Sequence, residues 1–121
     1  MTKRRESSDE AQYGEAVQAM ERGFASAKTK VAYYKLSGLG GAEVDADEAV
    51  ALLEERAKDR DCEAKWILGL CCEFGMGIEQ DIERAEKLYR ESCEGGSVVG
   101  KFMMENGIRR RGSGVMLASR L

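Results

Sequence analysis

Residues 64–77 read AKWILGLCCEFGMG, and a similar stretch stands 37 residues earlier at 27–40, where the chain reads AKTKVAYYKLSGLG. Both stretches begin with Ala-Lys and end with Gly-x-Gly. Further matches follow at an offset of 36: Asp45, Ala49, Leu52, Leu53 and Ala57 correspond to Asp81, Ala85, Leu88, Tyr89 and Cys93. The change of offset fits one extra residue between Gly40 and Asp45. A period of this length is typical of a helical solenoid, whose units bury their apolar faces against their neighbours.

Helical periodicity continues on both sides of the two matching units. The 121-residue chain has 14 glycines and no proline, which favours helices that are separated by glycine turns. Apolar residues recur at helical spacing in segments that we expect at about 10–22, 26–37, 45–57, 63–74, 81–93 and 97–106. The first segment looks like the second helix of a leading repeat, and the last looks like the first half of a third repeat. Its apolar residues are Val98, Phe102, Met103 and Met104. The sequence therefore predicts an all-α fold, an α/α solenoid of antiparallel helix pairs with two main repeats and flanking half-repeats.

Two aspartates are placed to begin helices. The carboxylates of Asp45 and Asp81 can accept hydrogen bonds from the free amides of a first helical turn. Glu48 follows Asp45 by three residues and could complete a capping box. Gly23 is expected to end the first helix, and the glycines at 38, 40, 41, 75 and 77 are expected to form the turns, because glycine takes positive φ without strain.

The second unit resembles a known family. Its pattern is Ala64-x-x-x-Leu68-Gly69, then Gly75-x-Gly77-Ile78, Asp81, Ala85 and the small Cys93 before Gly95-Gly96. This pattern resembles the Sel-one-like repeat (SLR), a relative of the tetratricopeptide (TPR) repeat, over residues 63–98 and less closely over 26–62. The resemblance implies helix pairs stacked in a right-handed superhelix. It also implies a non-enzymatic adaptor or scaffold that binds a protein or peptide.

The chain divides into three predicted parts. Residues 1–8 are polar and are expected to form a flexible N-terminal segment. Residues 9–108 are expected to form the solenoid, with repeats at about 26–62 and 63–98. Residues 109–121 form a basic C-terminal tail or a capping segment, in which Val115, Met116 and Leu117 could cover Phe102 and Met103.

Charge and composition exclude several classes of function. The formal net charge is −3, but the acidic residues outnumber the basic ones by about ten between positions 6 and 108. An acidic body argues against binding to nucleic acid, because the phosphates would be repelled over most of the surface. No apolar run reaches the roughly 20 residues of a membrane helix, and no hydrophobic signal segment begins the chain. We therefore expect a cytoplasmic protein.

No catalytic set or cofactor is expected. Histidine is absent, so the usual general base near neutral pH is missing. The four cysteines, Cys62, Cys71, Cys72 and Cys93, include no Cys-x-x-Cys pair and are expected to be free thiols rather than metal ligands. Cys72 and Cys93 fall on apolar helical stripes, which favours packing roles. The glycine clusters lack the preceding strand and the lysine of a phosphate loop.

Three aromatic residues are candidates for partner binding. Tyr33, Tyr34 and Trp66 lie on the first helices of the two units, and in the family that the chain resembles these helices line the concave face. Aromatic anchors often dominate the energy of an interface. The alternative is that Trp66 only packs between helices, and the sequence leaves both roles open.

The terminal sequences carry three short motifs. Ser7 follows Arg4-Arg5 and Ser113 follows Arg110-Arg111, in patterns that resemble phosphorylation sites of basophilic kinases. Ser119, Arg120 and Leu121 resemble the tripeptide that directs proteins to peroxisomes or glycosomes. The same three residues also fit a PDZ ligand or a structural cap.

Three hypotheses for function remain at this point. The first is the non-enzymatic adaptor, which could form a homodimer because half-repeats leave apolar layers exposed. The alternative is a small peroxisomal or glycosomal matrix protein that serves a metabolic enzyme. The third is an enzyme whose active site forms only in an oligomer.

Overall fold

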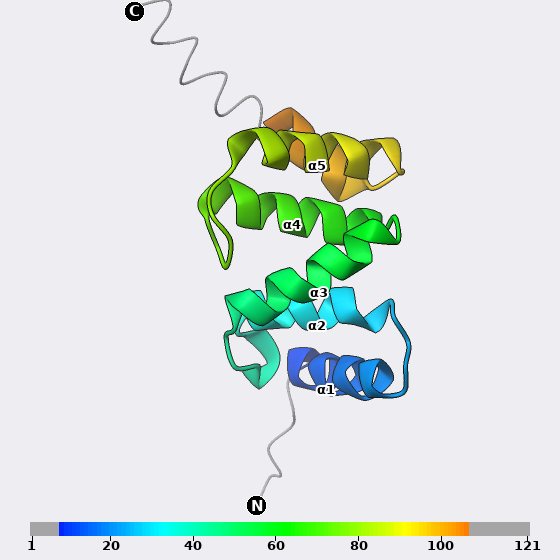
Figure 1. Ribbon diagram of the computed structural model, residues 1–121. Coiled ribbons are helices and arrows are strands. Elements are labelled where there is room, and N and C mark those ends of the chain that lie inside the picture. Colours follow the sequence, from blue (N-terminus) through cyan, green and yellow to red (C-terminus); the bar gives the residue numbers. More distant parts are fainter. Residues whose placement is uncertain (1–7, 107–121) are drawn as a thin grey trace, which may run out of the picture.

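The computed structural model describes residues 8–106, and this part of the chain folds into helices without a β-strand (Figure 1). Five α-helices follow one another, and a short 3₁₀ turn stands between the second and the third. Residues 98–106 form a further helix. The bounds are α1 Ser8–Glu21, α2 Ala27–Ser37, η1 Leu39–Gly41, α3 Ala46–Lys58, α4 Cys62–Phe74 and α5 Ile82–Glu94.

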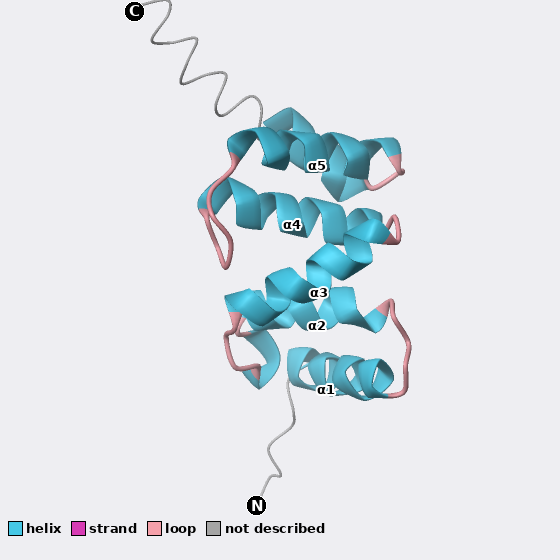
Figure 2. Cartoon of the chain, viewed as in Figure 1, coloured by secondary structure: helices cyan, strands magenta, loops and turns pink. Residues whose placement is uncertain are grey.

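The helices stack in the order of the sequence, so that each packs mainly on its neighbours along the chain. α2 and α3 form the first complete pair, α4 and α5 the second, and the loops lie on two opposite sides of the stack (Figure 2). α2 also touches α4 directly. The first helices of the two pairs therefore share one side of the molecule, as the prediction of an α/α solenoid requires.

The helix boundaries confirm the expected segments to within about two residues. Gly23 has φ of +93° just after α1, and Gly38 and Gly75 have φ of +74° and +70° where α2 and α4 end. These values lie in the left-handed region that glycine adopts without a steric penalty. The glycines thus end the helices that the sequence pattern begins.

The caps agree with prediction in part. The carboxylates of Asp45 and Asp81 accept the amides of Glu48 and Arg84, each at 3.0 Å. The predicted capping box is wrong in its second half, because the amide of Asp45 donates to the carbonyl of Lys35 at 2.9 Å. The Glu48 carboxylate instead pairs with the Lys35 ammonium at 3.2 Å. Glu48 therefore ties α3 to α2 rather than closing its own helix.

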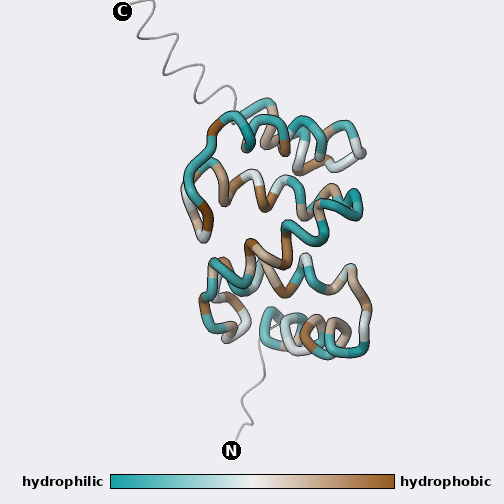
Figure 3. The backbone as a smooth tube through the Cα atoms, in the orientation of Figure 1, coloured by the Kyte–Doolittle hydropathy of each residue, from teal (hydrophilic) through white to brown (hydrophobic). Residues whose placement is uncertain are grey.

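The core runs through both helix pairs and collects the apolar stripes that the sequence predicts. Figure 3 shows hydrophobic and hydrophilic residues alternating along the helices, as expected for helices with one buried face. The central cluster consists of Ala32, Ala49, Val50, Leu53, Ala64, Ile67, Leu68, Cys71, Cys72, Ala85, Leu88 and Tyr89.

The last helix and one cysteine depart from the predicted core. Met103 and Met104 pack against the core, but Val98 and Phe102 are 82% and 60% exposed. Helix 98–106 therefore turns only one side of its predicted apolar stripe inward. Cys93 is half-buried rather than fully packed, while Ser92 beside it is buried and donates to the carbonyl of Cys62 at 2.6 Å.

The second glycine of each turn fixes how one unit sits on the previous one. A Cβ atom on Gly40 would lie 2.9 Å from the carbonyl carbon of Asp9, and one on Gly77 would lie 2.6 Å from that of Ala46. Both contacts are too close for any side chain. Asp9 and Ala46 are 37 residues apart, as Gly40 and Gly77 are. α1 therefore packs against the turn of the first pair in the same way as α3 packs against the turn of the second. α1 is thus the second helix of a leading repeat, as predicted.

The second pair is closed by a contact between Gly69 and Tyr89. A Cβ atom on Gly69 would lie 2.6 Å from Cε1 of the Tyr89 ring, so the aromatic ring rests directly on the backbone of α4. The Tyr89 hydroxyl donates to the Glu73 carboxylate at 2.7 Å in the interior. Glycine at position 69 therefore sets the distance between α4 and α5.

Candidate partner-binding site

A pocket of about 380 Å³ opens between α2 and α4 and brings together all three aromatic residues that the sequence predicts as partner contacts. Its other walls come from the same two helices and from Gln12 on α1. The lining residues are Gln12, Ser26, Thr29, Lys30, Tyr33, Tyr34, Asp61, Glu63, Trp66 and Ile67. We call it the aromatic pocket.

The three aromatic side chains differ in how accessible they are. Tyr33 is 41% exposed, whereas Tyr34 is only 4% exposed. The Tyr34 hydroxyl donates to Gln12 at 3.4 Å and its ring contacts that of Tyr13, with 5.4 Å between centroids. Trp66 is half-buried and donates from Nε1 to Glu63 at 2.6 Å. A ligand would therefore reach Tyr33 and Trp66 first, while Tyr34 joins α2 to α1.

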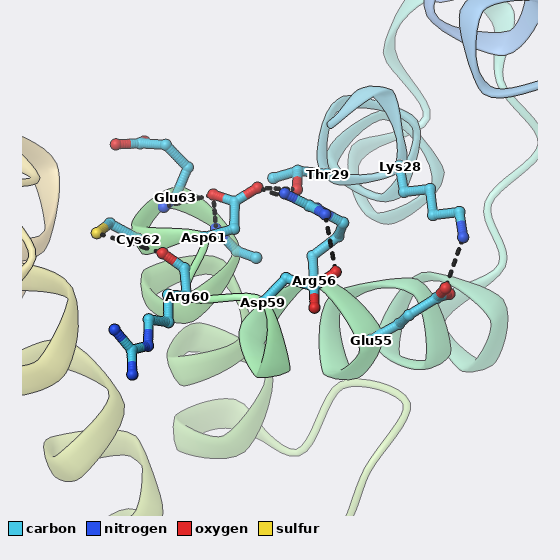
Figure 4. A network of polar contacts seen from close by, with 10 residues as sticks. Lys28, Thr29, Glu55, Arg56, Asp59, Arg60, Asp61, Cys62 and Glu63 are labelled. Carbon is cyan, nitrogen blue, oxygen red and sulfur yellow. Dashed lines mark hydrogen bonds and ion pairs between the residues drawn. The ribbon is translucent and has the colours of Figure 1, made fainter. Parts of the chain in front are cut away.

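Figure 4 shows a polar network centred on Asp61, and its members Thr29, Asp61 and Glu63 also line the pocket. The Asp61 carboxylate accepts from the Thr29 hydroxyl at 2.6 Å and from Nε of Arg56 at 3.4 Å. It also caps α4 by accepting the amides of Glu63 and Ala64, at 3.0 and 3.2 Å. One side chain thus links α2, α3 and α4 and holds the two walls of the pocket in place.

The environment of Asp61 favours its charged form. Burial is the largest single effect and raises the pKa of this carboxyl. The Thr29 hydroxyl, the Ala64 amide and the Arg56 guanidinium each lower the pKa, and their combined effect is larger than that of burial. The net result is a pKa below the ordinary value. Asp61 therefore remains a carboxylate, which is the state that accepts all four hydrogen bonds.

We expect Asp61→Ala to lower the free energy of unfolding by about 2 kcal/mol, since loss of an N-cap alone costs about 1 kcal/mol and the Thr29 hydroxyl also loses its acceptor. Urea unfolding followed by circular dichroism measures the change. Because the folded pKa is depressed, this stabilisation is complete above the unfolded pKa near 4 and is lost as the pH falls through the folded pKa. The gap between wild type and Asp61→Ala should thus narrow below about pH 4.

Asp47→Ala is the matched control, because Asp47 is exposed in the first turn of α3. It should change stability much less than Asp61→Ala at neutral pH. Equal effects of the two variants, or a gap that does not depend on pH, would contradict the role assigned to Asp61.

The sequence prediction missed the polar part of this site. Thr29, Lys30, Asp61 and Glu63 line the pocket but were not among the predicted contacts. Asp61 directly precedes α4, just as Asp45 precedes α3 and Asp81 precedes α5. Its role as an N-cap was therefore predictable from the sequence. Its contact with Thr29 joins residues 32 apart, and only the packing of α2 on α4 creates it.

The described residues can be searched for metal ligands and reactive thiols. Within 8–106, no group of three or more His, Cys, Asp or Glu side chains is placed to hold a metal ion. The four cysteines are free thiols. Burial, with a smaller contribution from neighbouring Cys72, raises the pKa of Cys71 to about 11, so this thiol is a packing group rather than a nucleophile.

The remaining predicted sites lie outside the described residues. These are Ser7, Ser113 and the tripeptide Ser119, Arg120 and Leu121, and they stay predictions, as do the flexible segment 1–8 and the tail 109–121. In the part of the chain from 8 to 106, no helix is both long and apolar enough to cross a membrane.

Paired helices at a period of 36 to 37 residues, joined by Gly-x-Gly turns that pack on the preceding unit, define a helical-repeat solenoid. The model of the Sel1 repeat matches residues 25–58 and 62–97. The chain therefore belongs to the Sel1 repeat family, as its resemblance to the Sel-one-like pattern predicts. Sel1 repeats are generally modules for protein interaction, and the family is typically non-catalytic.

Solved structures of related proteins show the same fold. A Sel1 repeat protein from Oxalobacter formigenes superposes with a TM-score of 0.65 at 23% identity, over 78% of this chain and 38% of that one. A protective antigen of uropathogenic Escherichia coli strains, which displays an SLR fold, gives a TM-score of 0.65 at 21% identity, over 81% of this chain and 21% of the antigen. This chain thus spans well under half the length of either protein. No curated protein matches it.

Proposed function

We propose that this protein is a non-enzymatic adaptor that binds a segment of a partner protein in the aromatic pocket. The observation that supports this function best is the convergence of Tyr33, Tyr34 and Trp66, from two different repeats, on one open pocket of about 380 Å³. A pocket built by two helices that a hydrogen-bond network holds together is largely formed before binding, which reduces the entropic cost of association.

The lining indicates the chemistry of the bound segment. Tyr33 and Trp66 offer ring surface for an apolar or aromatic side chain. Lys30 is exposed at the rim, and no ion pair of its own is found among the described residues, so it can pair with a carboxylate of the partner. We therefore expect a segment with an aromatic or large aliphatic anchor beside an acidic residue.

The test is selection of binding peptides from a displayed random library, followed by affinity measurement on the purified protein. Trp66→Ala should weaken the selected peptides about 30-fold, which corresponds to the roughly 2 kcal/mol of an interface hot spot. Trp66 is the single tryptophan of the chain, so its fluorescence reports directly on occupation of the pocket.

Lys87→Ala is the control, because Lys87 lies exposed on α5, outside the aromatic pocket. It should bind the selected peptides as the wild type does. Peptides that bind Trp66→Ala with undiminished affinity, or that leave Trp66 fluorescence unchanged, would show that the aromatic pocket is not the binding site.

A further inference from the structure

An open groove and an exposed apolar face lie at opposite ends of the stack. At the α1 end, a groove of about 440 Å³ between α1 and α2 is lined by Gln12, Glu15, Ala16, Ala19, Phe24, Ser26, Ala27 and Lys30. We call it the head groove. At the other end, helix 98–106 exposes Val98, Val99 and Phe102, which we call the tail face. Phe24 and Phe102 are each about 60% exposed.

The positions that line the head groove correspond to the positions of α3 and α4 against which α2 packs inside the molecule. Moving each of its eight residues forward by 37, the offset set by the Gly40 and Gly77 contacts, gives Ala49, Leu52, Leu53, Arg56, Asp61, Glu63, Ala64 and Ile67. Five of these eight residues belong to the core cluster or pack against it, and so do two residues of α2: Ala32, which belongs to the cluster, and Leu36, which packs against it. The head groove is therefore shaped for the first helix of a repeat.

Helix 98–106 is such a first helix. The Ser97 hydroxyl accepts the amide of Gly100 at 2.9 Å, just as Asp61 accepts that of Ala64. Asp61 and Ser97 are 36 residues apart, so α4 and the last helix are offset by 36 residues. Because α2 and α4 are offset by 37, α2 and the last helix are offset by 73. Phe102 then stands where Thr29 stands in α2.

Three of the positions that would meet at such a junction change chemistry together. Inside the molecule, Thr29 contacts Asp61, which also contacts Arg56. The corresponding positions at the two ends hold Phe102 on the tail face, with Phe24 and Ala19 in the head groove. A polar trio is thus replaced by an apolar trio at all three positions, which favours direct packing between Phe102 and Phe24.

We propose that the tail face of one copy of this chain docks in the head groove of the next, with Phe102 packed against Phe24, so that chains associate head to tail. Charge supports this partner: α1 carries four acidic and no basic residues, and the sequence beyond helix 98–106 contains Arg109, Arg110 and Arg111. The docked surfaces differ from each other, so the contact can propagate beyond a dimer. This inference does not depend on peptide binding in the aromatic pocket.

Sedimentation of the full chain over a wide range of protein concentration tests the proposal. The average mass of the wild type should rise with concentration past twice the 13.4 kDa monomer. Phe24→Asp blocks the head groove and Phe102→Asp blocks the tail face, and both residues are exposed, so the folds should persist. Each variant alone should stay monomeric. An equal mixture should form a dimer and nothing larger, because each variant keeps one intact surface.

Two further variants complete the experiment. Val44→Asp changes a residue that is 62% exposed and outside both surfaces, and it should associate as the wild type does. A wild type that stays monomeric overturns the proposal. The second variant, which lacks residues 107–121, then identifies what covers the tail face. If this variant associates, the chain's own C-terminal segment covers the tail face, and the proposal is still overturned. A wild type that stops at a dimer, or a mixture of the two variants that stays monomeric, also overturns it.

Discussion

Gly69→Leu should lower the free energy of unfolding by about 3 kcal/mol or more, at the upper end of what overpacking of a core costs. The reason is the contact between α4 and α5. Even the first added carbon would lie 2.6 Å from the Tyr89 ring, and that ring is held by its hydroxyl on the buried Glu73. Neither the backbone of α4 nor the Tyr89 ring can move away without separating α4 from α5. Urea unfolding followed by circular dichroism measures the loss.

Gly14 provides the matched control for Gly69. It lies within α1, and a Cβ atom there would meet nothing within 4 Å. Gly14→Ala should therefore raise stability by about 0.5–1 kcal/mol, because glycine in a helix interior is unfavourable, whereas Gly69→Ala should lower it. Equal responses at the two positions would refute the close approach of α4 and α5.

Ala85→Arg is expected to unfold the second pair. Ala85 is fully buried in the central cluster on α5, so the guanidinium would enter the core without a partner. An unpaired buried charge costs about 3–5 kcal/mol, which is comparable with the whole stability of many small domains. The melting temperature and the fluorescence of Trp66 on the facing helix should both report the loss.

Ala51→Arg tests whether burial is the cause of that loss. Ala51 also lies on the second helix of a pair, α3, but it is exposed. The same substitution there should change the melting temperature little, because arginine is a good helix former. An unchanged melting temperature for Ala85→Arg would contradict the alignment of the two repeats.

Much of the fold could be predicted because its signals are local. The offset of 36 to 37 residues, the aspartates before the helices and the glycines after them each act through the backbone of their own segment. Sequence reasoning therefore placed the helices and identified α1 as the second half of a leading unit. Its prediction of a capping box at Glu48 was wrong, because the Glu48 carboxylate pairs with Lys35 of α2 instead. It also failed at Phe102, whose exposure depends on what packs beside helix 98–106.

The candidate site was predictable only in its aromatic members. Their positions on the first helix of each unit indicated a shared face, but no pattern in the sequence pairs Thr29 with Asp61 or fixes the volume between α2 and α4. Such contacts arise when one unit stacks on the next. The accessibility of Tyr33 against the burial of Tyr34, its neighbour in the chain, is likewise a result of stacking.

By itself, the sequence determined the helices, their order and the family, because helix propensity, capping and repeat spacing act over a few residues or recur at a constant distance. The tertiary structure decided which side chains meet: Tyr89 on Gly69, Asp61 between three helices, and three aromatic residues around one pocket. The physical reason is that such contacts join residues far apart in the chain, such as Gly69 with Tyr89, Thr29 with Asp61 and Tyr33 with Trp66, and the distance between them is set only when the helices pack.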